Sequence, residues 1–315
     1  MRRSFKDYLI LTAKGMAMGA ADVVPGVSGG TIAFISGIYE ELINTISGVK
    51  VGLLHTWKNE GFKAMWQQLN GNFIVALLGG ILVSIFTVMR LTNYLLENHP
   101  ILIWSFFFGL VLASVYYVAK QIENWTFNVF LFLIIGAGVA FYLTSLPPLT
   151  AAANDLYLFF AGAIAICAMI LPGISGAFIL VLLGAYKTVS EAAHEFDFKV
   201  LGIVALGAIF GLLSFSRLLK WLFRNYSTLT LATLTGFIAG SLNKIWPWKL
   251  QLETVQYGDK VITLRDESVM PWNFGSEPHT FQAFVLMLAG FALILILEGL
   301  AEKKPVQNDA ANPNV

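Results

Sequence analysis

The sequence predicts an all-α polytopic membrane protein, and three observations support that fold class. Hydrophobic residues make up 57% of the 315-residue chain and charged residues only 12%, whereas soluble domains average roughly half and about a quarter. Several apolar runs reach the roughly 20 residues that a helix needs to cross a bilayer. Two further runs are broken by nearly the same Pro-Gly-x-Ser-Gly motif. We therefore expect about six full transmembrane helices plus two re-entrant broken-helix hairpins in an inverted repeat.

The two interrupted runs are the most distinctive feature of the chain. The first reads Val-Val-Pro-Gly-Val-Ser-Gly-Gly-Thr over residues 23–31, and the second reads Ile-Leu-Pro-Gly-Ile-Ser-Gly-Ala over residues 170–177. Proline cannot donate a backbone hydrogen bond and glycine favours unusual dihedrals, so each motif should end one helix and begin another. Irregular backbone at membrane depth persists only where it is packed in protein or lines a wet cavity. We interpret both motifs as binding-site elements; the alternative is that each only makes a tight turn with close helix contacts.

Residues 1–126 are expected to form a first repeat. A hairpin at 5–47 surrounds the first motif, although two complete but strained spans also fit these residues. An insert at 48–72 mixes lysines with tryptophan and phenylalanine, which indicates an amphipathic segment lying in the membrane interface. The remaining elements of this half are full spans at 73–96 and 100–119, followed by a connecting span at 127–146.

Residues 155–245 are expected to form a second repeat, with a hairpin at 156–189 and full spans at 200–223 and 229–245. A polar extracytoplasmic loop follows at 246–280. Within it, the residues on either side of Gly258 and Asp259 alternate like a small β-hairpin that would serve as a surface lid or decoration. The last elements are a final span at 281–301 and a disordered tail at 302–315.

The distribution of basic residues predicts the orientation, because Lys and Arg in short loops favour the cytoplasm. In this topology one side collects Arg2, Arg3, Lys6, Lys50, Lys58, Lys63, Lys120, Arg217, Lys220, Arg224, Lys303 and Lys304. The opposite side holds Lys187 and Lys199 beside three acidic residues, and the long loop, which the rule weighs lightly. Both termini are therefore expected in the cytoplasm.

The two halves of the chain are related in sequence. Aligning Pro25 with Pro172 places Gly15 on Gly162, Ala21 on Ala168, Ser28 on Ser175, Gly37 on Gly184 and Tyr39 on Tyr186. Aligning Arg90 with Arg217 places Gly80 on Gly207, Asn98 on Asn225, Gly109 on Gly236 and Ser114 on Ser241. The alignment shifts because the first half carries the interfacial insert. Since three full spans separate the hairpins, the second copy would be inverted in the membrane, as is typical of transporters.

Together the motifs and the paired arginines predict an anion site near the membrane midplane. After each break the backbone N–H groups of the next half-helix lack partners, and serine and threonine hydroxyls add further donors. The arginines lie on matching small-residue faces, which fits either packing seams with snorkelling arginines or two equivalent anion contacts. The expected phosphate-binding residues are Gly26, Ser28, Gly29, Gly30, Thr31, Gly173, Ser175, Gly176, Arg90 and Arg217.

Three carboxylates near the first motif are candidate coupling groups. Asp22 precedes the break and aligns with Met169, while Glu40 and Glu41 end the half-helix. They fit a structural role as caps or solvated interface groups. They also fit a proton or cation coupling site, since a carboxylate in a low-dielectric environment has a raised pKa and can take up a proton. The residues alone do not choose between these roles.

The chain resembles the bacterial polyprenyl-phosphate transporter family, long catalogued as a domain of unknown function. Three features carry the resemblance: the first motif together with Gly19-Ala-Ala-Asp22 before it, the second motif, and the order of spans. The resemblance runs to about Leu300. It implies translocation of undecaprenyl phosphate across the cytoplasmic membrane for reuse of this carrier lipid, with the bilayer and the lipid as partners. The functional residues that the family implies for this chain are those of the two motifs and, with a weaker match, the paired arginines. The alternative from the residues is a secondary transporter or channel for a small soluble anion.

Other function classes find little support. No basic block suggests nucleic acid, and the single Cys167 excludes a disulfide framework and a zinc cluster. The four histidines fall in loops or at span ends without metal spacing or a nucleophile, so we expect no metal and no enzyme, a membrane phosphatase being the enzyme alternative. No cofactor is expected, and the lack of a nucleotide-binding loop disfavours ATP as the energy source. The sequence leaves room for a homo-oligomer.

Overall fold

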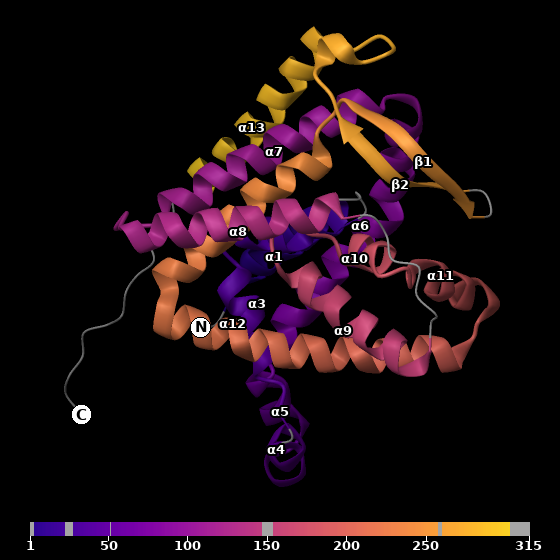
Figure 1. Cartoon of the computed structure of the whole chain (residues 1–315). Helices are drawn as coiled ribbons and strands as arrows, with labels where there is room; N and C mark the ends of the chain where they lie inside the picture. Colours follow the sequence, from indigo (N-terminus) through magenta and orange to yellow (C-terminus); the bar gives the residue numbers. More distant parts are fainter. Residues whose placement is uncertain (1–2, 23–27, 51, 147–153, 258–259, 303–315) are drawn as a thin grey trace.

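The computed structural model of the chain describes residues 3–22, 28–50, 52–146, 154–257 and 260–302 (Figure 1). Gly26 of the first motif and residues 303–315 of the expected tail lie outside these ranges. The helices of the first half are α1 (Phe5–Asp22), α2 (Gly29–Ile35), α3 (Tyr39–Ser47), α4 (Gly52–Glu60), α5 (Phe62–Gln68), α6 (Gly71–Asn98), α7 (Pro100–Lys120) and α8 (Phe127–Ser145). Those of the second half are α9 (Asp155–Ile170), α10 (Gly176–Leu182), α11 (Tyr186–Glu195), α12 (Phe198–Ser241), the short 3₁₀ helix η1 (Leu242–Ile245) and α13 (Thr280–Glu302).

The apolar helices make the chain a multi-pass membrane protein. Among the described residues, four helical segments are long and apolar enough to cross a bilayer, or five if the bent pair α10 and α11 is one span. This count leaves the expected six full spans unconfirmed, because it takes α12 as one segment. The backbone of Tyr226, with φ −139° and ψ 45°, is not helical, so α12 consists of two helical arms that meet there at a kink. The two arms lie where the spans at 200–223 and 229–245 were expected, and the second continues into η1.

Each hairpin begins with a helix that runs parallel to the next long helix. Gly15 and Gly19 of α1 lie so close to α6 that added Cβ atoms would fall 2.3 Å and 2.6 Å from the carbonyl oxygens of Leu77 and Ile81. Gly207 and Gly211 of α12 likewise meet Phe159 and Ala163 of α9. Because the residue numbers rise together along both pairs, the chain between the partners must return to the side on which it started, which either a re-entrant hairpin or a pair of complete spans would do.

The remaining long helices pair across the two halves of the chain. Gly109 of α7 lies against the backbone of Met287 in α13, and Gly290 of α13 lies against Phe106 in α7. In the same way α8 packs against the second arm of α12, where Gly136 meets the carbonyl of Thr233. Glycine at these positions lets the helix backbones approach closely, as is common in membrane proteins.

Two segments stand outside the packed helices (Figure 1). The expected interfacial insert forms the short helices α4 and α5, with Trp57 and Phe62 exposed. The expected β-hairpin is confirmed as antiparallel strands β1 (Lys249–Tyr257) and β2 (Lys260–Ser268), each longer than the alternating pattern indicated. Trp248, which is fully buried, holds the base of this hairpin against Ile101 and Ala283.

Candidate functional site

The two interrupted runs meet inside the protein. We call residues 28–31 the first tip and residues 169–176 the second tip. The Ser28 hydroxyl donates to the second tip at the carbonyl oxygens of Met169, at 3.1 Å, and Leu171, at 3.2 Å. In return the backbone N–H of Gly173 donates to Thr31 Oγ1 at 2.9 Å. Since Ser28, Thr31 and Gly173 are all buried, segments from the two halves of the chain form one internal structure.

The glycines of the motifs are required by this contact. A Cβ on Gly30 would fall 2.5 Å from the carbonyl oxygen of Ile170 in the second tip, which is too close for any side chain. Gly173 has a φ of +92°, a conformation that L side chains rarely adopt, and it packs against Ile238 and Ser241 of α12. The motif therefore permits the approach of the tips as well as the break in each helix.

Most of the donors that we expected to hold a phosphate have protein partners in this conformation. Asp22 Oδ1 accepts from the N–H of Gly29 at 2.7 Å, so an intramolecular carboxylate lies where an external anion would bind. The Ser28 hydroxyl caps α2 by accepting from the N–H of Gly30 at 3.1 Å. In the second tip Ser175 precedes α10 without a side-chain capping bond, and Gly176 lies close to the carbonyl of Ala165.

Of the paired arginines, the structure describes the side chain of Arg217 alone. Arg217 is exposed on α12 and donates from Nη2 to the carbonyl oxygen of Val49, just beyond α3, at 3.0 Å. Arg90 belongs to α6, but its side chain lies outside the described residues. The structure thus brings together the two tips and Asp22, and it places Arg217 on another contact.

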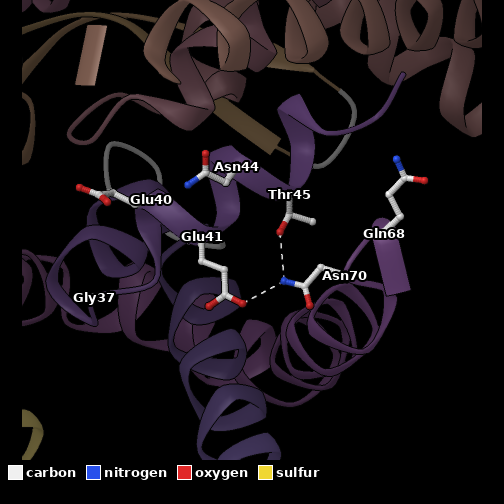
Figure 2. A pocket seen from close by; sticks show the side chains of 7 residues that line it. All are labelled: Gly37, Glu40, Glu41, Asn44, Thr45, Gln68 and Asn70. Carbon is white, nitrogen blue, oxygen red and sulfur yellow. Dashed lines mark hydrogen bonds between the residues drawn. The ribbon is translucent and has the colours of Figure 1, made fainter. Parts of the chain in front are cut away.

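Glu40 and Glu41 line a separate polar cavity of about 500 Å³, shown in Figure 2. The guanidinium of Arg3 binds the carboxylate of Glu41 through two hydrogen bonds, one of them 2.7 Å long. The side-chain amide of Asn70, which starts α6, also donates to Glu41 at 2.9 Å and to Thr45 at 3.3 Å (Figure 2). Glu41 therefore ties the N-terminal segment and α3 to the start of α6, whereas Glu40 is exposed at the cavity.

A second charged cluster lies at the base of the β-hairpin and was not singled out from the sequence. Asp266 of β2 accepts from Lys244 Nζ at 3.1 Å and from Lys249 Nζ at 2.8 Å. Burial alone would raise the pKa of Asp266, but the two lysines hold this pKa below its usual value. Only the strand register reveals the cluster, because Asp266 comes near Lys249 once β1 and β2 are paired.

Within the described residues, no group of three or more His, Cys, Asp or Glu side chains is placed to hold a metal ion.

Three comparisons with known proteins bear on this arrangement. Residues 18–261 match the profile of a family described as VCA0040-like, undecaprenyl phosphate translocase-like. A "Polyprenyl-phosphate transporter" from Vibrio cholerae serotype O1 is 48% identical over 302 residues, which cover 94% of this chain and 98% of that protein. A protein of the same name from Staphylococcus aureus is 32% identical over 264 residues, covering 78% of this chain and 88% of that protein. Both names denote transporters rather than enzymes, in agreement with the expected class, and no solved structure matches the chain.

Proposed function

The chain belongs to the VCA0040-like, undecaprenyl phosphate translocase-like family, and on this premise we propose that it is a flippase for undecaprenyl phosphate or a similar polyprenyl phosphate. The lipid would cross the cytoplasmic membrane so that the carrier can be used again. The observation that carries the proposal is the contact between the two tips, through Ser28, Thr31 and Gly173. Two helices broken at membrane depth, with their loops against each other, are the arrangement in which transporters bind substrates.

An inverted repeat is part of the proposal. Under the sequence alignment, α7 corresponds to the second arm of α12. The alignment does not reach α8 or α13, and we propose that these two correspond because each follows the aligned span in its half. The packing is reciprocal in these terms, because α7 packs on α13 while α8 packs on the second arm of α12. Likewise α1 packs on α6 as α9 packs on the first arm of α12. Such an exchange of equivalent partners is what a two-fold axis in the membrane plane would produce.

Phosphate binding at the tips requires a change from the conformation described above. The phosphate would replace the Asp22 carboxylate at the N–H of Gly29 and take the N–H of Gly173 from Thr31, so the tips must part. Arg90 and Arg217 would supply charge to the opened site, and Gly26, Gly30, Ser175 and Gly176 would supply its backbone shape. The prenyl tail would stay in lipid beside the exposed apolar side chains of the long helices, such as Phe86, Ile134 and Leu206.

Translocation of the lipid phosphate to the cytoplasmic side of the membrane needs an energy source. Moving an anionic head group inward against the membrane potential costs about 2.3 kcal/mol per charge per 100 mV. We propose coupling to protons or another cation, with Asp22 as the first candidate because its carboxylate accepts a hydrogen bond from Gly29 in the first tip, and with Glu40 and Glu41 as the others. Both termini would lie in the cytoplasm, in accord with the distribution of basic residues.

The test is uptake of a polyprenyl phosphate by proteoliposomes that contain the purified chain. We expect uptake that depends on prenyl chain length, is not competed by inorganic phosphate at equal concentration, and responds to an imposed pH gradient. Equal competition by soluble phosphate would favour a transporter of small anions. Uptake that is unchanged when the gradient is imposed or collapsed would exclude proton coupling.

A further inference from the structure

The second tip is connected to the base of the β-hairpin by a short run of contacts. Gly173 packs against Ile238 and Ser241 at the end of α12. One turn further on, η1 carries Lys244, whose ammonium lies 5.0 Å from the centre of the Phe178 ring in α10. The base of the β-hairpin thus adjoins the helix that leaves the second tip.

Lys244, Lys249 and Asp266 form a compact cluster at this place. Their side chains are 24%, 15% and 20% exposed, so all three are largely removed from water. Both ammonium groups share a single carboxylate, which leaves the cluster with a net charge of +1. Burial lowers the pKa of Lys249 even though Asp266 acts in the opposite direction, so the one carboxylate does not fully offset the desolvation of this ammonium.

The backbone that carries the two lysines is held firmly. Trp246 donates from its indole N–H to the carbonyl oxygen of Val269 at 2.8 Å, and Trp248 donates to that of Pro278 at 2.8 Å. The two indole rings pack edge to face with their centres 5.3 Å apart. An excess positive charge on a firmly held backbone is preorganised for an anion, because little conformational freedom is lost when the anion binds.

We propose that Lys244 and Lys249 form a receiving site for a phosphate group on the β-hairpin side of the membrane, with Asp266 as the competing internal anion. The incoming phosphate accepts hydrogen bonds from both ammonium groups, and the adjoining α10 leads from there to the tips. A lipid head group and free phosphate both offer this chemistry. The assignment of the phosphate to the lipid rests on the proposed function.

The test measures phosphate binding to the purified full-length protein by calorimetry, with inorganic phosphate and farnesyl monophosphate as probes. Lys244→Gln and Lys249→Gln should each weaken binding about tenfold, the loss of one charge-assisted contact. Asp266→Asn should tighten binding several-fold at neutral pH, because it removes the competing carboxylate. Lys199→Gln is the matched control, since it breaks a Lys–Asp pair of 2.8 Å that is exposed, and it should bind like the wild type. Lys249→Arg keeps the charge and should retain most of the affinity.

The opposite effects of Asp266→Asn and of the lysine variants on phosphate affinity distinguish a binding site from an ion-pair cluster that is only structural. If Asp266→Asn weakens binding as much as the lysine variants do, or if the lysine variants bind like the wild type, the proposal is overturned. Preferential loss of farnesyl monophosphate binding assigns the site to the lipid head group, and equal loss of both probes assigns it to free phosphate. The wild type tests the proposed function separately: if it binds phosphate through these lysines yet moves no polyprenyl phosphate in proteoliposomes, only the transport proposal fails.

Discussion

Replacement of Thr31 by valine tests the contact between the tips with the smallest change in shape. Thr31 is 0% exposed, and its hydroxyl accepts the N–H of Gly173 at 2.9 Å. Valine keeps the volume but leaves that buried N–H without its acceptor, which costs about 1–3 kcal/mol. At roughly 2–4 °C per kcal/mol for a chain of this size class, the melting temperature should fall by about 2–12 °C.

The assay is thermal unfolding of the purified protein in one detergent, followed by tryptophan fluorescence. Thr87→Val is the matched control, because Thr87 is exposed and its hydroxyl donates only within α6, to the carbonyl of Val83 at 2.8 Å. The control should stay within about 0.5 kcal/mol of the wild type. If Thr31→Val melts at the same temperature as the control, the hydrogen bond between the tips contributes nothing to the stability of the protein, and the reasoning that the tips form one unit is refuted.

Three further predictions concern other parts of the account. Gly30→Ala should separate the tips and lower both folding yield and transport, because its Cβ would fall 2.5 Å from a backbone carbonyl, whereas Gly79→Ala, which meets nothing within 4 Å, should behave like the wild type in expression and uptake assays. Arg217→Ala should cripple uptake and leave membrane insertion intact; normal uptake would remove Arg217 from the proposed site. Since the pKa of Asp266 is lowered, its ionised form stabilises the hairpin base above about pH 4, and this contribution is lost as the pH falls through the lowered pKa. Tryptophan fluorescence should report that acid transition in the wild type, and Asp266→Asn should lack it.

Local patterns in the sequence were enough to predict much of the helical arrangement. The predicted spans at 73–96, 100–119 and 127–146 agree within two residues with α6, α7 and α8, because long apolar runs leave little choice of structure in a membrane. The turn at Gly258 and Asp259 predicted the β-hairpin for a similar local reason. The predicted break between the spans at 200–223 and 229–245 agrees with the kink at Tyr226 in α12, although no proline or glycine marks that position.

The contents of the candidate site depended on contacts between distant residues, which a pattern does not encode. The motifs predicted donors at both tips, but the sequence could not show that Asp22 and Thr31 would engage two of those donors. The matching positions of Arg90 and Arg217 suggested equal roles, yet the carbonyl of Val49 is the partner that the structure gives to Arg217. Sequence symmetry predicted where equivalent residues lie along their helices and not what their side chains contact.

The most direct test of the central claim is a reversible lock on the two tips. The Ser28 hydroxyl lies 3.2 Å from the carbonyl oxygen of Leu171, so the tips are in contact, and cysteine pairs with one member in each tip are screened for a disulfide after Cys167 is replaced by alanine. If the tips must part to bind the lipid phosphate, the oxidised protein takes up no polyprenyl phosphate in proteoliposomes, and reduction of the same sample restores uptake. Equal uptake before and after reduction, with the cross-link verified by mass spectrometry, would contradict the account.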